Sequence, residues 1–196
     1  MWILPSRSRP HNCARLFRHI RKPGILCIDN DDPQRELYEA LPLPFSWILK
    51  TAPRVGLGEI YNRQFRAFPN LKWYGVLADD VVPETEDWEQ QLIDAALPDG
   101  MAFGDDGING HERGTHFVLA GELVRDIGWL ALPGLDRIFI DTVWNDIAKK
   151  RGVRRYLPGV MVIHRHFSNQ TAPWDETYRK TNKPADLAIY EQWRLS

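Results

Sequence analysis

Residues Leu71–Pro83 read Leu-Lys-Trp-Tyr-Gly-Val-Leu-Ala-Asp-Asp-Val-Val-Pro, and this stretch decides the fold. The apolar run from Trp73 to Leu77 is typical of a buried strand, and two adjacent carboxylates, Asp79 and Asp80, follow it. Ligands of open α/β sheets bind at the carboxyl ends of the strands. Adjacent acids repel each other and resist dehydration, so a cation is expected beside them. A divalent ion carrying a phosphorylated substrate meets this need, and an acidic turn before a helix is the alternative.

The chain around this stretch alternates between expected strands and expected helices. Strands are expected at 2–4, 25–28 and 45–49, and helices at 11–20, 33–41, 59–67 and 84–97. This alternation predicts parallel strands joined by helical crossovers, and therefore an α/β fold. The loops that follow the strands then open on one edge of the sheet, which is the expected nucleotide cleft.

The second half of the chain mixes short strands with helices. Strands are expected at 101–103, 117–120 and 160–163, and helices at 121–128, 141–150 and 185–193. A length of 196 residues suits one domain, so residues 1–196 are expected to form a single unit. Residues 168–196 are expected to pack on its body as a C-terminal tail.

Composition narrows the classes of partner and compartment. The net charge is -1 and the sequence pI is about 6.6, so no global field attracts nucleic acid or a membrane surface. Two cysteines, Cys13 and Cys27, without metal-type spacing favour a reduced, cytoplasmic protein. No apolar run approaches the length of a membrane span, and the Met1–Pro5 start is too short for a signal peptide.

Three features follow one another along the chain: the paired acids after the fourth strand, then Asp141 at a helix start, then His164 at the end of the last strand. In this order the sequence resembles the GT-A glycosyltransferases, especially the small inverting enzymes of the family 2 type, over residues 2–167. The resemblance implies a Rossmann-like, three-layer fold with a mostly parallel mixed sheet. It also implies a small, phage-type glycosyltransferase of the hexosyltransferase type. Such an enzyme moves a sugar from a nucleotide diphosphate sugar, here expected to be a UDP-sugar, to a carbohydrate or other hydroxyl acceptor.

The resemblance implies a metal site formed by Asp80 and His164, with Asp79 reaching the ribose. Ala78 stands where the family's Asp-x-Asp motif has its first acid, so the ribose contact and the choice of metal-binding aspartate stay open. His166 competes with His164 for the ligand role. A mixed oxygen and imidazole site suits Mn²⁺ and tolerates Mg²⁺.

The resemblance also implies a general base and a nucleotide site. Asp141 would remove the proton from the acceptor hydroxyl as it attacks the anomeric carbon, and capping of its helix is the alternative role. Asp29 is expected to hydrogen-bond the nucleobase. The residues expected to bind the nucleotide sugar, besides Asp79, are Pro5, Ser6, Arg7, Asp29, Arg54, Gly56 and Asn62.

Other residues are less specific candidates for contacts with the acceptor or the donor. The loop 104–116 is weighed as an acceptor loop against plain solvated surface. Basic residues are weighed as diphosphate contacts, and tryptophans as platforms for a sugar ring. These candidates are His111, Glu112 and Arg113 in the loop, Arg9, Arg179 and Lys180 for the diphosphate, and Trp129 and Trp174 for the sugar.

Three other functions stay open. One is a glycosyltransferase acting on hydroxymethylated bases in DNA, against which the near-neutral charge argues. The second is a nucleotide-sugar binding module without catalysis. The third is a metal-dependent nucleotidyltransferase.

Overall fold

The computed structural model describes residues 1–172, 174 and 183–196. The strands are β1 (Trp2–Pro5), β2 (Gly24–Asp29), β3 (Trp47–Ala52), β4 (Trp73–Val76), β5 (Val81–Pro83), β6 (Met101–Asp105), β7 (Phe117–Ala120) and β8 (Arg154–His164). The helices are α1 (Pro10–Leu16), α2 (Arg35–Glu39), α3 (Leu57–Ala67), α4 (Trp88–Ala96), α5 (Gly121–Ile127), α6 (Ile140–Arg151) and α8 (Lys183–Leu195), with 3₁₀ turns η1 (Phe17–His19) and η2 (Phe167–Asn169).

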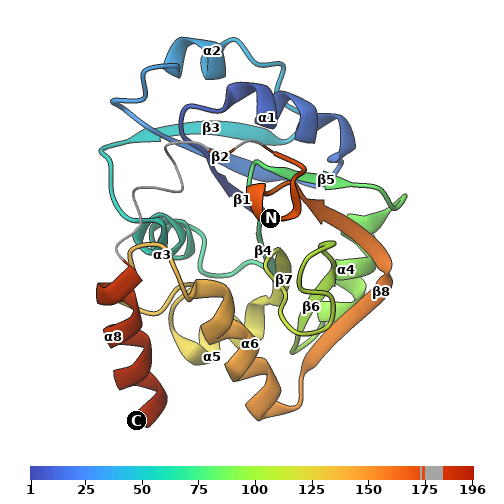
Figure 1. Ribbon diagram of the computed structural model, residues 1–196, viewed down its shortest axis with the longest axis vertical. Helices are drawn as coiled ribbons and strands as arrows, with labels where there is room; N and C mark the ends of the chain where they lie inside the picture. The colour runs from blue at the N-terminus through green and yellow to red at the C-terminus, as the bar shows by residue number, and fades with distance from the viewer. Residues whose placement is uncertain (173, 175–182) are drawn as a thin grey trace.

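The described strands form one eight-stranded sheet in the order β3-β2-β1-β4-β7-β6-β8-β5. Strands β1 to β4 are mutually parallel, with Ile3 of β1 level with Ile25 of β2 and Val76 of β4. Strand β7 is antiparallel to β4 and β6, and β5 is antiparallel to β8. Figure 1 shows α1 and α2 on one side of strands β1 to β3 and α3 on the other. The predicted α/β class with a mostly parallel mixed sheet is confirmed.

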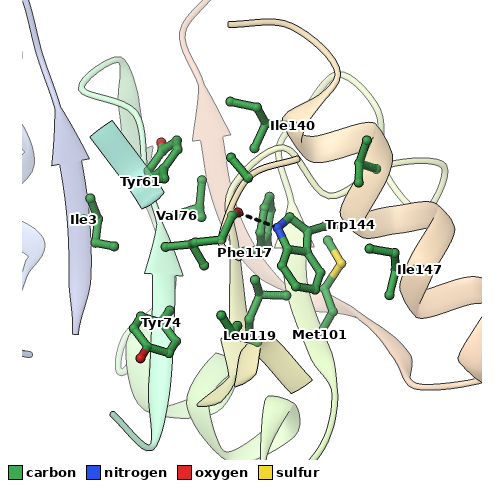
Figure 2. Close-up of a cluster of buried hydrophobic side chains, with 14 of the residues drawn as sticks. Ile3, Tyr61, Tyr74, Val76, Met101, Phe117, Leu119, Ile140, Trp144 and Ile147 are labelled. Atoms are coloured by element: carbon green, nitrogen blue, oxygen red, sulfur yellow. Dashed lines mark hydrogen bonds between the residues drawn. The ribbon is translucent and has the colours of Figure 1, made fainter. Parts of the chain in front are cut away.

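Side chains alternate between the two faces of the sheet and build two cores. From β1, Ile3 joins a cluster with α3, α5 and α6, whereas Trp2 and Leu4 pack on the other face with α1 and α4. Figure 2 shows the first cluster, in which the Trp144 indole N–H donates to the Leu130 carbonyl at 2.7 Å. Helices therefore cover both faces of the sheet, which gives the three layers that were expected.

The structure differs from the predicted elements near residues 81–87 and along β8. Residues Val81–Pro83 form β5, and the helix expected at 84–97 begins only at Trp88, after Asp87 adopts a left-handed φ of 52°. Strand β8 starts at Arg154, six residues before the predicted strand at 160–163. Its basic start looked polar in the sequence, yet the Arg154 guanidinium lies 4.5 Å above the Phe103 ring.

Cys13 and Cys27 are both buried, free thiols. Across the described helices, none combines the length and the hydropathy that a bilayer crossing requires.

Gly24 and Gly75 leave room for tryptophan rings within the parallel part of the sheet, Gly24 for Trp47 and Gly75 for Trp2. A Cβ atom added to Gly75 of β4 would lie 2.0 Å from the Trp2 ring, which itself packs against Trp73 and Trp88 at 5.6 and 5.0 Å between centroids. We expect Gly75→Ala to destabilise the protein by about 1–3 kcal/mol through overpacking, measured by urea denaturation.

The matched control for this substitution is Gly159→Ala, because a Cβ at Gly159 meets no described atom within 4 Å. Equal losses of stability in the two variants would contradict the packing argument for Gly75.

Candidate active site

The carboxyl edge of the parallel strands borders a cavity of about 460 Å³. Its wall comes from the loops after β1 to β4 and from the segment before α6. Of the residues expected in the nucleotide and metal sites, the ones that line this cavity are Pro5, Ser6, Arg7, Asp29, Arg54, Gly56, Asp79 and Asp80. The strand topology thus gathers four separate loops at one place, as parallel strands require.

Asp79 is tied to the first loop and the first helix. Its Oδ2 accepts a hydrogen bond of 2.5 Å from Ser6 Oγ, and its Oδ1 lies 3.4 Å from both Arg9 Nη1 and Asn12 Nδ2. The Ser6 hydroxyl also lies 2.7 Å from the Tyr38 hydroxyl. This network orients the Asp79 carboxylate in the cavity wall.

Asp80 meets His164 because β5 pairs with the end of β8. In that antiparallel pair Val81 lies opposite His164, and the Arg165 amide donates to the Asp80 carbonyl at 2.8 Å. The Asp80 Oδ1 atom lies 3.3 Å from His164 Nε2. This oxygen is buried and has no hydrogen-bond partner among the described residues, since the histidine contact lacks hydrogen-bond geometry.

The surroundings shift the pKa values of Asp79 and Asp80 in opposite directions. Burial and the neighbouring charge of Asp80 raise the pKa of Asp79. Burial also acts to raise the pKa of Asp80, but the positive charges of His164 and Arg9 outweigh it, so its pKa is lowered. Burial acts to lower the pKa of His164, and Asp80 outweighs that effect and raises it. Asp80 is therefore the more acidic of the two and the one that attracts a cation more strongly.

The donor set at Asp80 and His164 fits a divalent ion that a substrate helps to hold. Carboxylate oxygen and imidazole nitrogen both suit Mn²⁺, and the buried Asp80 Oδ1 lies 3.3 Å from His164 Nε2 without accepting a hydrogen bond from the described residues. Within residues 1–172, 174 and 183–196, no group of three or more His, Cys, Asp or Glu side chains is arranged to hold a metal ion. Any ion here would need further ligands, which phosphate oxygens and water commonly supply.

Arg9 has a role that the sequence did not reveal. Its guanidinium Nη1 lies 3.4 Å from Asp79 Oδ1 and 3.3 Å from Asp80 Oδ2, and only 9% of the residue is exposed. It was considered as an exposed diphosphate contact, but it lies buried as the counter-charge of both acids. The other two diphosphate candidates, Arg179 and Lys180, lie outside the described residues.

At the far end of the cavity, Arg7 joins the first two loops. Its Nη1 donates to Asp29 at 2.7 Å and to Asp31 at 2.8 Å. Asn62 does not line this cavity. Its side chain accepts from the Leu130 and Ala131 amides at 2.9 Å and donates to the Ala131 carbonyl, so it holds the backbone that follows α5.

Asp141 lies in the first turn of α6, apart from the residues that line the cavity. The N-cap of this helix is Phe139, so the expected capping role of Asp141 is wrong; its Oδ1 instead accepts from the Thr142 amide at 2.8 Å. Arg113 lies 3.3 Å away and acts to lower the pKa of Asp141, but burial outweighs it and raises that pKa. The charge of Asp141 also helps to raise the pKa of Tyr61, a cavity residue.

Of the acceptor-loop candidates, Arg113 lies beside this aspartate. Arg113 pairs with Asp141 and donates to Asn109 at 3.0 Å, and the exposed His111 and Glu112 side chains pair with each other at 2.8 Å. Of the tryptophan candidates, Trp129 packs on Trp144 with 5.5 Å between ring centroids, and Trp174 is half-exposed.

His116 is a buried residue that sequence reasoning missed. Its ring lies 4.8 Å from the His164 ring, centroid to centroid, and its Nε2 has no hydrogen-bond partner among the described residues. Burial lowers the pKa of His116 to about 3. The ring of His166, the alternative ligand, lies 5.2 Å from the His164 ring, centroid to centroid. Burial lowers the pKa of His166. Three imidazoles therefore cluster here, with the His164 ring between Asp80 and its two histidine neighbours as their shared contact.

The α/β fold of this chain is similar to the GT-A-like fold of solved nucleotide-sugar transferases. No protein-family model matches the sequence, and no curated protein matches it. Solved structures match at low identity. Mannosyltransferase PcManGT from Pyrobaculum calidifontis, solved in complex with GDP-Man and Mn²⁺, matches with a TM-score of 0.70 and 11% identity. That match covers 100% of this chain and 64% of the mannosyltransferase, so the chain spans only part of that protein's length.

Two further structures extend the likeness. A protein assigned as a nucleotide-diphospho-sugar transferase from Desulfovibrio desulfuricans matches with a TM-score of 0.54 and 11% identity, over 98% of this chain and 97% of that one. A cytidylyltransferase from Leptospira borgpetersenii matches with a TM-score of 0.52 and 9% identity, over 80% of this chain and 74% of that one. These likenesses establish the fold.

We expect Arg9→Ala to destabilise the protein by about 3–5 kcal/mol, because it leaves two buried carboxylates without their counter-charge. The measurement is the free energy of unfolding in urea at neutral pH. Arg35→Ala is the matched control. Arg35 pairs with Glu39 at 2.6 Å, but the two side chains are 45% and 44% exposed, respectively. That pair is expected to contribute about 1 kcal/mol or less. Similar losses for the two variants would contradict the role of Arg9.

Proposed function

We propose that this chain is a metal-dependent glycosyltransferase that moves a sugar from a nucleotide diphosphate sugar to an acceptor hydroxyl, with inversion at the anomeric carbon. A UDP-sugar is the donor we expect from the sequence, and GDP-Man in the mannosyltransferase structure makes GDP the second nucleotide to test. In this proposal Pro5, Ser6, Arg7, Asp29, Arg54 and Gly56 hold the nucleotide.

The observation that carries the proposal is the buried Oδ1 of Asp80, which faces His164 Nε2 at 3.3 Å and accepts no hydrogen bond from the described residues. A buried carboxylate oxygen without a donor costs free energy, which a bound cation offsets. We assign Asp80 and His164 as the protein ligands of Mn²⁺ or Mg²⁺. A bound ion of this kind supplies positive charge against the departing diphosphate. Arg9 compensates much of the charge of the two acids before any substrate binds.

Asp141 is assigned as the general base. The base accepts the proton of the acceptor hydroxyl while the hydroxyl oxygen attacks the anomeric carbon and the bond from that carbon to the diphosphate breaks. A raised pKa makes Asp141 a stronger base than an ordinary aspartate. Arg113, 3.3 Å from Asp141, keeps the carboxylate oriented and limits the rise in its pKa.

We expect Asp80→Ala to abolish the Mn²⁺-dependent part of the thermal stabilisation by UDP or GDP. Ligands stabilise a folded protein by mass action, so the melting temperature reports the loss of the metal-bridged complex. Asp94→Ala, which removes an exposed acid on α4, is the control and should retain the full shift. A full metal-dependent shift in the Asp80 variant would refute its ligand role.

We expect Asp141→Asn to leave donor binding intact and to lower turnover by about 10²–10⁴-fold, the usual contribution of a general base. Turnover of the parent enzyme should fall as the pH drops through the raised pKa of Asp141, because only the ionised carboxylate accepts a proton. Transfer is measured with a labelled donor against a panel of sugar acceptors. Asp126→Asn, at an exposed ion pair with Arg151, is the control. Weaker donor binding with normal turnover would contradict the assignment.

A nucleotidyltransferase is the second candidate, because the cytidylyltransferase from Leptospira borgpetersenii shares the fold. The two functions differ in the bond that breaks. Exchange of labelled pyrophosphate into a nucleoside triphosphate, in the presence of a sugar phosphate, would favour this candidate over sugar transfer.

A further inference from the structure

One wall of the cavity belongs to the segment that links α5 to α6. Asp136 and Arg137 line the cavity described above, and Asp136 also lines a second cavity of about 440 Å³ on its other side. Gly56 borders both cavities as well. The two cavities therefore share lining residues, and a shift of this segment changes the shape of the nucleotide-sugar site.

The C-terminal helix holds the backbone of this wall through the carboxylate of Asp186. Asp186 of α8 accepts hydrogen bonds from the consecutive backbone amides of Asp136, Arg137 and Ile138, at 2.8, 2.9 and 2.7 Å. Only 1% of Asp186 is exposed. Figure 1 shows the first turn of α8 beside the segment that precedes α6. Three charge-assisted bonds to successive amides hold a loop backbone more tightly than neutral contacts do.

Helix α3 fixes the opposite side of the same segment. The Gly58 amide donates to the Asp136 carbonyl at 3.2 Å. A Cβ atom on Gly56 would lie 2.3 Å from Asp136 Oδ1, and one on Gly58 would lie 2.3 Å from the Leu135 carbonyl oxygen. The segment is thus held between a glycine-only surface of α3 and the Asp186 carboxylate.

We propose that Asp186 is a positioning residue of the nucleotide-sugar site. This inference rests on the function proposed above. Its carboxylate holds Asp136 and Arg137 in the cavity wall, so the C-terminal helix controls nucleotide binding without touching the ligand. Any loss of this grip lets the wall move and weakens binding of a nucleoside diphosphate.

The chain offers a control on the same helix. Tyr190 of α8 donates from its hydroxyl to Asp146 at 2.6 Å, and its ring stacks on Phe139 with 5.0 Å between centroids. Tyr190→Phe removes a tether of α8 to α6 but leaves the stacking and all three bonds of Asp186. It separates general loosening of α8 from loss of the grip on the wall.

The experiment compares wild type, Asp186→Ala, Asp186→Asn and Tyr190→Phe. Amide hydrogen exchange at Asp136, Arg137 and Ile138 reports the grip, and calorimetric binding of UDP and of GDP with Mn²⁺ reports the site. Asp186→Asn keeps the shape of the side chain but loses its charge and one acceptor oxygen, so it tests the grip if the alanine variant does not fold. We expect faster exchange and about tenfold weaker nucleotide binding in both Asp186 variants, with neither change in Tyr190→Phe.

The outcomes separate the two proposals. Unchanged exchange at the three amides in the folded Asp186 variants overturns the positioning role. Faster exchange with wild-type affinity also overturns it. A wild-type chain that binds neither nucleotide contradicts the proposed function itself, whereas a binding wild type with equally tight Asp186 variants contradicts only the inference about Asp186.

Discussion

Two adjacent carboxylates at the end of a buried strand impose the constraint on which the rest of the site depends. Asp79 and Asp80 repel each other, and removing both from water requires donors and positive charge nearby. Ser6, Arg9 and Asn12 serve Asp79 from β1 and α1, and His164 approaches Asp80 from the end of β8. The first helix and the last strand, far apart in sequence, are thus brought to one point by charge as much as by packing.

Most of the parallel half of the fold was accessible from sequence because β1, β2 and β4 are buried on both faces. Such strands read as continuous apolar runs, as in Ile25–Ile28 and Trp73–Leu77. The edge strand β3 is partly exposed, and it spans Trp47–Ala52 where 45–49 was expected. The missed elements are those whose partners lie far along the chain. Strand β5 has only three residues and is defined by its pairing with β8. The start of β8 looks polar in sequence because of Arg154 and Arg155, but Arg154 packs over the Phe103 ring and Arg155 donates to the Ala95 carbonyl.

The site was predictable where loops follow parallel strands. That rule alone brings Ser6, Asp29, Arg54 and Asp79 to one edge, and the cavity contains all four. Residues that act through burial escaped the same reasoning. Arg9 resembles any other arginine in a basic N-terminal segment, Asn62 proves to hold backbone amides, and His116 lies in a loop that reads as solvated. Asp186 is one acid in a polar helix until the fold places three amides around it.

Strand β8 lies between β6 and β5, and an irregularity in its pairing with β6 fixes where its end points. Leu157 lies opposite Gly104 of β6, but Met161 lies opposite the very next residue, Asp105, so residues 158–160 bulge out of the ladder. Beyond the bulge, the strand ends beside β5 with His164 at its tip. Because side chains alternate along a strand, losing one residue between the bulge and the tip would turn the imidazole to the opposite face. The number of residues in this short interval therefore decides which face of the sheet the imidazole meets, whatever residues fill it.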